Sequence, residues 1–261
     1  MIVVKFGGHA MRDENGNFAA AIAAALAAGE QVVVVHGGGP QIDAALAAKA
    51  IVSRWAGGFR ITTQEIFEVV EQVLVHEVGP QVANTLRKAG IEAQSISART
   101  LPTIIATKRS QIVAGTLVDL GLVGDVVSVN PAQLNQLLKQ GVVPVVAPIS
   151  ATEDLLTGLN VNADFAAAAI AAALQATALI VMTDVAGIYR NWPDKTSLID
   201  SITASQLESI KSTFAQGMAP KVQAALDAIA QGATAVRIID GTDSESFAAA
   251  LIGTGGTLVV A

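Results

Sequence analysis

Cysteine is absent from this chain, and histidine, aromatic and charged residues are scarce. The 261 residues include three histidines, 4 % aromatic residues and 15 % charged residues. Without cysteine the chain can form no disulfide bond and can use no thiolate as a nucleophile, which fits a cytoplasmic protein. The histidines, His9, His36 and His76, lie far apart in the sequence. A histidine-based metal site is therefore not expected.

Positive charge and long apolar runs are also limited. The formal net charge is -6, and the lysines and arginines form no cluster. This balance argues against a nucleic-acid-binding surface. The longest apolar stretch, residues 163–174, is interrupted by Asp164 and is too short to span a bilayer. The first residues have the pattern of a strand rather than of a signal peptide. We expect neither nucleic acid nor membrane as a partner.

Several common motifs of phosphate-binding and hydrolytic proteins are missing. The sequence has no GxxxxGK[ST] string, no GxGxxG after a predicted strand and no GxSxG. These absences exclude a P-loop protein and the common hydrolase elbow, and they disfavour a dinucleotide-binding protein of the usual kind. The remaining chemistry is that of lysines, carboxylates and backbone amides. Such a set suits phosphoryl transfer, which depends on positioning and charge neutralisation more than on a nucleophilic side chain.

The chain alternates between two kinds of apolar segment. Hydrophobic residues make up 52 % of the sequence, and β-branched runs alternate with alanine-rich ones. This pattern predicts a mostly parallel sheet covered by helices. Expected strands are 2–6, 32–36, 142–146, 178–182, 235–239 and 257–260, and expected helices are 17–28, 41–49, a helix from about 64, 80–88, 131–140 and 163–175. Residues 56–63 are expected to form a loop, and residues 96–129 short strands in hairpins that form a flap.

No linker divides the chain, so we expect one continuous domain with two lobes that share the sheet. The predicted lobes are residues 1–165 and residues 166–261.

Glycine-rich turns follow three of the predicted strands. The run 32–36 ends in Gly37-Gly38-Gly39, the first strand ends in Gly7-Gly8, and residues 183–187 follow a later strand. A strand, a glycine turn and a helix together point backbone N–H groups at an anion. A tight turn without a ligand is the alternative. Because ligands bind beyond the carboxyl ends of parallel strands, these turns are expected to converge on one crevice.

Two lysines and one polar segment stand out against their local surroundings. Lys5 ends a buried strand and therefore needs an anionic partner, unless it reaches solvent. Lys221 follows Pro220 in the first turn of a predicted helix, where a positive charge opposes the helix dipole. Residues 160–164 precede an apolar helix, which Asn162 or Asp164 can cap. Capping of this helix gives no role to Asn160.

Taken in order, these segments resemble the amino acid kinase family, and within it the members that phosphorylate N-acetyl-L-glutamate in arginine biosynthesis. The matching segments are 3–11, 35–42, 57–62, 121–126, 160–164, 183–188 and 217–222, which span nearly the whole chain. Residues 191–198 look most like actinobacterial members. The resemblance implies a three-layer αβα sandwich with a central, mostly parallel sheet, as in carbamate kinases.

The resemblance further implies phosphoryl transfer from ATP to the side-chain carboxylate of N-acetyl-L-glutamate, giving N-acetyl-L-glutamyl 5-phosphate. Lys5 and Lys221 would flank the transferring phosphoryl group and neutralise its charge. Asp164 would hold both lysines rather than act as a base, since the attacking carboxylate needs no deprotonation. Backbone N–H groups of Gly8 and Gly38 would contact the reacting oxygens.

Binding roles are implied for further residues. Gly38 and Gly39 would contact the substrate, and Arg60 and Asn160 would bind its α-carboxylate, since a guanidinium fork suits a planar anion. The residues expected near ATP are Lys5, Gly7, Gly8, Thr183, Asp184, Val185 and Lys221. Mg²⁺ is expected through the ATP phosphates, without a dedicated protein site. His36 is expected to be structural rather than catalytic.

The resemblance also bears on lobe function and assembly. The first lobe would bind the amino-acid substrate and form a homodimer, and the second lobe would bind the nucleotide. Relatives inhibited by arginine carry a helix before the first strand that links dimers into hexamers, whereas here the first strand begins at Ile2. Residues 247–252 are apolar where those relatives have acidic and polar residues. We expect a homodimer that is insensitive to arginine.

Other functions remain open. A related kinase could act on aminoadipate or glutamate linked to an acidic carrier protein, or on another small carboxylate. The basic residues available for such a partner are scattered: Arg54, Arg60, Lys108 and Arg109. Kinases of nucleoside monophosphates or carbamate share the fold, but residues 58–60 combined with 160–164 favour an acylated amino acid. A catalytically silent binding protein is a third alternative, against which the intact Lys5, Asp164 and Lys221 argue.

Overall fold

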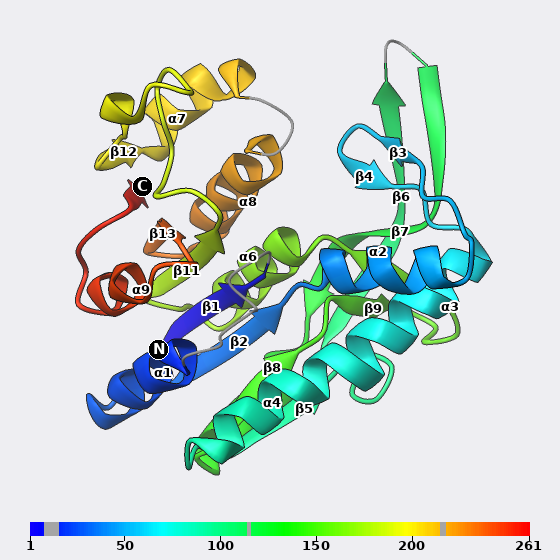
Figure 1. Ribbon diagram of the computed structural model, residues 1–261. Coiled ribbons are helices and arrows are strands. Elements are labelled where there is room, and N and C mark those ends of the chain that lie inside the picture. Colours follow the sequence, from blue (N-terminus) through cyan, green and yellow to red (C-terminus); the bar gives the residue numbers. More distant parts are fainter. Residues whose placement is uncertain (8–15, 114–115, 215–217) are drawn as a thin grey trace.

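An eight-stranded sheet with helices on both faces forms the body of the protein (Figure 1). The computed structural model describes residues 1–7, 16–113, 116–214 and 218–261. The strands of this sheet are β1 (Ile2–Phe6), β2 (Val32–His36), β5 (Ala93–Ile96), β8 (Val143–Val146), β11 (Ala178–Thr183), β12 (Ser201–Thr203), β13 (Ala235–Asp240) and β14 (Thr257–Val260). Their order is β12-β14-β13-β11-β1-β2-β8-β5. All strands from β13 to β5 are parallel, whereas β14 is antiparallel to β13.

The consecutive valines of the central strands contribute to two separate cores. Val33 and Val35 belong to the core on one face of the sheet, and Val32 and Val34 belong to the core on the other. Successive side chains of a strand point to opposite faces, so a strand buried on both faces is apolar at every position. The predicted three-layer αβα sandwich with a mostly parallel sheet is therefore confirmed.

The helices that cover the sheet are mostly those expected. They are α1 (Asn17–Ala27), α2 (Gly39–Ala48), α3 (Gln64–Glu71), the π-helical η2 (Gln72–Val78), α4 (Gly79–Lys88), α5 (Pro131–Lys139), α6 (Ala163–Ala173), α7 (Ala204–Ile210), α8 (Ala219–Ala230) and α9 (Ser244–Leu251), with short 3₁₀ turns η3 (Lys195–Ser197) and η4 (Lys211–Thr213). Helices α5 to α8 contribute to one core, and α1 to α4 and α9 to the other. Within the described ranges, no helix is both long and apolar enough to cross a membrane.

Residues 64–88 form one continuous helical run, rather than two separate helices. Thr63 caps its start, because its side chain accepts the N–H of Ile66 at 3.3 Å. The run does not stop before Pro80. Instead it widens into the π-helical η2, and Pro80 lies in the first turn of α4. Proline has no N–H to donate to the preceding turn, and the π-helical segment accommodates that loss without ending the helix.

The predicted loop at 56–63 is also wrong in part. Trp55–Ala56 (β3) and Phe59–Arg60 (β4) pair as a small antiparallel hairpin. Two glycines form its turn, a combination typical of two-residue hairpins. Arg60 is therefore held on a strand, rather than on a flexible loop.

The hairpins expected within 96–129 are present, but the strands are long rather than short. Strands β6 (Ile104–Val113) and β7 (Thr116–Val129) form a hairpin that projects beyond the sheet (Figure 1). Together with β9 (Ile149–Ala151) and β10 (Gly158–Val161) they close a four-stranded barrel. Register shifts between β6 and β7 mark bulges that bend the strands, so glycine and aspartate occur within them and not only at their turns.

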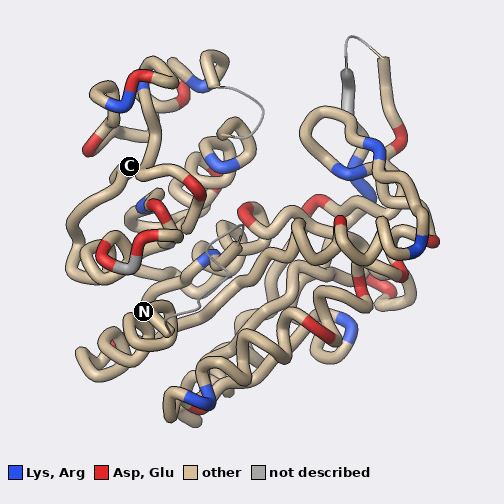
Figure 2. Tube along the Cα trace, viewed as in Figure 1, with Lys and Arg blue, Asp and Glu red and all other residues tan. Residues whose placement is uncertain are grey.

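The two halves of the chain share the sheet. Strand β11 pairs directly with β1, with Ile180 opposite Val4. The expected lobe boundary at residues 165 and 166 falls inside α6. Positive and negative residues are interspersed over both halves (Figure 2).

Candidate active site

The central strands end at a cavity of about 250 Å³. The sequence-predicted residues that line it are Lys5, Gly38, Gly39, Arg60, Asn160 and Asp164. The chain continues from β1 to β2 on one side of the sheet and from β11 to β13 on the other. Strand order thus reverses between β1 and β11, and open α/β sheets bind ligands beyond the carboxyl ends of strands at such a point.

The glycine turns after β1 and β2 touch each other. A Cβ on Gly37 would lie 3.3 Å from the Cα of Gly7, and a Cβ on Gly7 would lie 3.0 Å from the Nζ of Lys5. The Gly37 N–H donates to the carbonyl of Phe6 at 2.7 Å, which joins the two turns. A side chain at either glycine would crowd this approach, in which the Lys5 side chain lies folded over Gly7. The predicted site residue Gly8 lies outside the described residues.

The carboxylate of Asp164 lies between two lysines. Its Oδ1 is 3.1 Å from the Nζ of Lys5, and its Oδ2 is 3.2 Å from the Nζ of Lys221. The side chains of Lys5 and Asp164 are only 8 % and 5 % exposed. Burial by itself raises the pKa of Asp164, but the ammonium groups of both lysines outweigh this effect and the pKa is lowered overall. Asp164 is therefore ionised at neutral pH.

Local structure explains how these groups meet. Asn162 caps α6, because its side chain accepts the Asp164 N–H at 2.8 Å and leaves the Asp164 carboxylate directed to the lysines. Lys221 lies in the first turn of α8, with Pro220 beside it as predicted. A lysine there opposes the helix dipole, and the ion pair with Asp164 offsets that conflict.

Arg60 is buried and is held by two polar residues that the sequence does not mark as part of a site. Its Nη2 is 2.8 Å from Oδ1 of Asp43 in α2, and its Nη1 donates to the hydroxyl of Ser53. Its guanidinium carbon lies 4.5 Å from the centre of the Trp55 ring, a cation–π contact. A guanidinium has five N–H donors, so these two bonds leave three for a ligand. The sequence around Asp43 and Ser53 does not indicate that they bind Arg60, because these contacts depend on how the β3–β4 hairpin packs over α2.

Asn160 is tied to the strand that carries Arg60. Its Nδ2 donates to the hydroxyl of Thr62 at 3.2 Å, and that hydroxyl donates to the carbonyl of Arg60 at 2.8 Å. Thr62 is fully buried. These contacts give Asn160 the structural explanation that capping of α6 lacks, since they hold its amide at the cavity.

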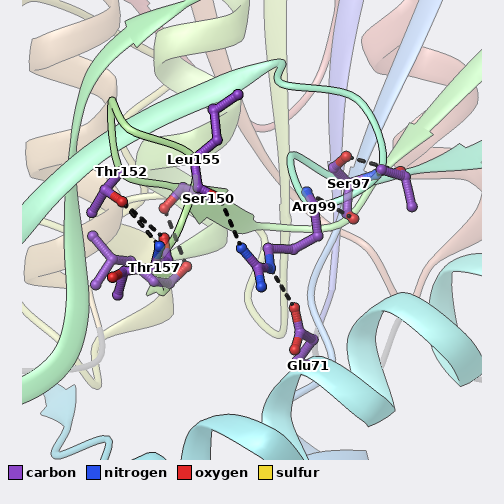
Figure 3. A network of polar contacts seen from close by, with 9 residues as sticks. Glu71, Ser97, Arg99, Ser150, Thr152, Leu155 and Thr157 are labelled. Carbon is purple, nitrogen blue, oxygen red and sulfur yellow. Dashed lines mark hydrogen bonds and ion pairs between the residues drawn. The ribbon is translucent and has the colours of Figure 1, made fainter.

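A second polar network anchors the hairpin that delivers Asn160 (Figure 3). Arg99 donates from Nε to Glu71, at the end of α3, at 2.9 Å, and from Nη1 to the carbonyl of Leu155 at 3.4 Å. Thr152 and Thr157 bond to each other across the same β9–β10 turn. Helix α3 and strand β10 are thus fixed relative to each other outside the cavity.

The segment predicted to contact the nucleotide lies at the neighbouring strand end. Thr183, the last residue of β11, exchanges hydrogen bonds with Val185 at 2.9 and 3.0 Å. It lies two residues beyond Val181, which is opposite Lys5 in the sheet. Thr183, Asp184 and Val185 do not line the cavity described above. Thr183 ends β11, and Asp184 and Val185 follow directly after it.

His36, at the end of β2, is fully buried. Burial lowers the pKa of its imidazole to about 4, although a hydrogen bond with the Gly37 carbonyl opposes this effect. The side chain is therefore neutral at physiological pH, in agreement with a role other than proton transfer.

The buried imidazole makes stability depend on pH. In the unfolded chain His36 takes up a proton below about pH 6.5, whereas the folded protein resists protonation down to about pH 4. The unfolded state therefore gains protons first, and His36 is expected to lower the free energy of unfolding by about 3 kcal/mol as pH falls through this window. Urea unfolding at a series of pH values measures the effect. His36→Asn, which cannot titrate, is the control, and parallel profiles for both proteins would contradict the expectation.

Comparisons with known proteins show the family to which the chain belongs. A model of the amino acid kinase family matches residues 1–240. An acetylglutamate kinase of Streptomyces avermitilis is 44 % identical over 242 residues, which cover 92 % of this chain and 80 % of that protein. An acetylglutamate kinase of Kineococcus radiotolerans is 42 % identical over 270 residues, covering 100 % of this chain and 90 % of that protein. Both relatives are actinobacterial, as residues 191–198 suggested.

A solved structure of Giardia carbamate kinase has the same fold. It superposes with a TM-score of 0.71 at 18 % identity, covering 99 % of this chain and 98 % of that one. The family match extends over most of the chain and includes the strands and helices that bring Lys5, Asp164 and Lys221 together. The chain belongs to the amino acid kinase family.

Proposed function

We propose that this protein transfers the γ-phosphoryl group of ATP to the side-chain carboxylate of N-acetyl-L-glutamate, giving N-acetyl-L-glutamyl 5-phosphate. The observation that carries the proposal is the Asp164 carboxylate, which holds Lys5 and Lys221 beside a cavity lined by glycine amides and a buried arginine. Relatives named acetylglutamate kinase support the choice of substrate.

Charge is the main obstacle to this reaction, because a carboxylate must approach a phosphate. The ammonium groups of Lys5 and Lys221 neutralise the phosphoryl oxygens from two sides and stabilise the charge of the transition state. Asp164 keeps the two groups in place. It takes no proton, since the attacking carboxylate is already ionised and the lowered pKa of Asp164 keeps it ionised as well.

The substrate carboxylates are assigned to different parts of the cavity. Arg60 and Asn160 bind the α-carboxylate, because a guanidinium fork and an amide present donors that match a planar anion. The N–H groups of Gly38 and Gly39 face the reacting carboxylate and the phosphoryl group. Gly8 is proposed to share this role.

ATP is proposed to lie over the ends of β1 and β11, against Gly7 and residues 183–185. The carboxylate in the cavity is already engaged by two lysines, so Mg²⁺ fits as an ion carried by the ATP phosphates, where it supplies further charge neutralisation. Residues 1–165 would form the substrate lobe and residues 166–261 the nucleotide lobe. The homodimer, its insensitivity to arginine and the cytoplasmic location stay predictions.

Arg60 offers a direct test of substrate binding through Asp43. Asp43→Asn removes the charge that holds the guanidinium and is expected to raise KM for N-acetylglutamate roughly tenfold, the effect of about 1.4 kcal/mol. The KM for ATP is expected to change little. Steady-state kinetics with each substrate varied in turn measures both values. Glu68→Gln, at an exposed helical position, is the control, and an equal rise in both KM values would contradict the assignment.

A substrate panel tests the proposed function. ADP release is measured with N-acetylglutamate, glutamate, aspartate and carbamate as acceptors. We expect turnover with N-acetylglutamate, and trapping of the acyl phosphate with hydroxylamine identifies the product. Turnover only with a non-acetylated acceptor would overturn the proposal. Activity only with a carrier-linked aminoadipate or glutamate would favour the related carrier-dependent kinases, and no turnover with any acceptor would favour a binding protein.

A further inference from the structure

The buried imidazole of His36 bonds to the backbone of the glycine turn that lines the cavity. Its Nδ1 lies 2.7 Å from the carbonyl oxygen of Gly37. A carbonyl oxygen can only accept a hydrogen bond, so Nδ1 carries the proton and Nε2 does not. Nε2 has no hydrogen-bond partner among the described residues. The single polar contact of this side chain is therefore directed at one peptide group.

That contact determines which way the next N–H points. A trans peptide is planar, and its C=O and N–H groups point in opposite directions. The carbonyl of Gly37 is held by buried His36, so the N–H of the same peptide, which belongs to Gly38, points the opposite way. Gly38 lines the cavity, and its N–H has no acceptor in the described part of the chain.

The flanking peptides are fixed as well. The Gly37 N–H donates to Phe6, and the Gly38 carbonyl accepts the N–H of Ile42 at 2.9 Å, which starts α2. Rotation of the peptide between Gly37 and Gly38 is thus the remaining freedom of the turn. The bond to His36 removes it.

Residues of η2 and α4 pack against His36 and against the glycine turn. A Cβ on Gly79 would lie 3.0 Å from Nε2 of His36, so the imidazole packs directly against the backbone there. A Cβ on Gly38 would lie 2.5 Å from Cδ2 of Leu74, so the turn also rests on that side chain. The ring is thus fully buried beside the backbone of Gly79.

We propose that His36 is a positioning residue, whose Nδ1–H holds the Gly37 carbonyl so that the Gly38 N–H faces the cavity and donates to the reacting oxygens. The inference rests on the proposed phosphoryl transfer and extends it to a residue that touches neither substrate. A donor that is oriented before the substrates bind stabilises developing negative charge without reorganising during the reaction. A neutral imidazole holds the Gly37 carbonyl without adding a positive charge to the glycine turn.

Two variants whose new side chains have similar shapes, His36→Asn and His36→Leu, separate this role from packing. In His36→Asn the amide nitrogen can take the place of Nδ1 and restore the donor, whereas His36→Leu keeps a similar shape without a donor. We expect kcat to fall by about 10²-fold in His36→Leu, as for loss of an oxyanion donor, and by less than about tenfold in His36→Asn. The KM for ATP is expected to stay within about twofold in both. Thermal unfolding of both variants verifies that each is folded.

NMR of ¹⁵N,¹³C-labelled protein supplies a readout that does not depend on turnover. In the ligand-free wild type and in His36→Asn, the Gly37 carbonyl should show the shift of a hydrogen-bonded group, and the imidazole nitrogens of the wild type should report protonation at Nδ1. Addition of N-acetyl-L-glutamate with ADP should move the Gly38 amide proton downfield in both proteins, but not in His36→Leu.

The outcomes distinguish the two proposals. Equal turnover of His36→Leu and the wild type, or equal losses in the Leu and Asn variants, would overturn the role of His36. Protonation at Nε2 in the wild type would overturn it even if neither variant folds. If the wild type fails to phosphorylate N-acetylglutamate, the proposed function fails, whereas the ligand-free carbonyl and imidazole shifts still decide whether His36 orients this peptide.

Discussion

Lys221→Ala is expected to lower kcat by about 10³-fold and to change the KM for ATP by less than about fivefold. Lys221, in the first turn of α8, contacts the same carboxylate as Lys5, so we expect its ammonium group to lie beside the transferring phosphoryl group. A group that stabilises charge mainly in the transition state affects kcat rather than ground-state binding. Steady-state kinetics with ATP varied at saturating N-acetylglutamate measures the two constants.

A second lysine provides the matched control for this result. Lys211 forms an exposed ion pair with Glu208 one helical turn away, and Lys211→Ala is expected to leave both constants unchanged. Lys221→Arg keeps the charge but changes its geometry, and an intermediate kcat is expected. If Lys221→Ala changed only the apparent affinity for ATP, the proposed role in the transition state would be wrong.

Asp164→Asn is expected to lower the free energy of unfolding by about 3–5 kcal/mol, in addition to abolishing most activity. The substitution keeps the size of the side chain and removes its charge. Lys5 would then be a buried cation without its counter-ion, since its side chain is only 8 % exposed and its ion-pair partner is Asp164. Urea unfolding at pH 7 measures the loss of stability, and initial rates measure the loss of activity.

The double variant Lys5→Met, Asp164→Leu separates the two effects. Replacing a buried ion pair by apolar residues of similar volume is often neutral or stabilising, so this variant should recover much of the stability that Asp164→Asn loses. It should remain inactive, because it lacks the charge that neutralises the phosphoryl group. A stable Asp164→Asn protein would show that Lys5 does not depend on Asp164, and would contradict the buried ion pair.

Much of the architecture was predictable because its causes are local. The alternation of valine-rich and alanine-rich runs predicts the central strands and most helices, and the glycines mark the turns at the carboxyl ends of β1 and β2. Errors arose where one pattern is compatible with two conformations. Glycines at 121 and 124 resemble turn residues but lie within β7, and Pro80 resembles a helix start but lies inside a continuous helical run.

The candidate site was predictable as a set of residues, but of its contacts only those of Asp164 with Lys5 and Lys221 were expected, from the family resemblance. Two residues of this set stand out in the sequence because helix formation does not explain them. Capping of the helix does not account for Asn160, and the charge of Lys221 opposes the helix dipole. Asp43, Ser53 and Thr62 carry no such signal, since a polar residue on a helix or loop is ordinarily solvated. Their contacts with Arg60 and Asn160 exist only because the β3–β4 hairpin packs over α2 and against β10.

The sequence by itself determined the class of fold, the glycine turns and the residue types available for chemistry, because strand period, helix formation and turn conformation depend on near neighbours. The tertiary structure places the buried Asp164 carboxylate between Lys5 and Lys221, as the family resemblance implied. It alone shows that Asp43 bonds to Arg60 and that His36 bonds to the Gly37 carbonyl. These pairings join groups from separate strands and helices, or depend on the burial that surrounding helices impose. Burial strengthens the contacts of Asp164 and His36, and that burial depends on the packed structure rather than on any single stretch of sequence.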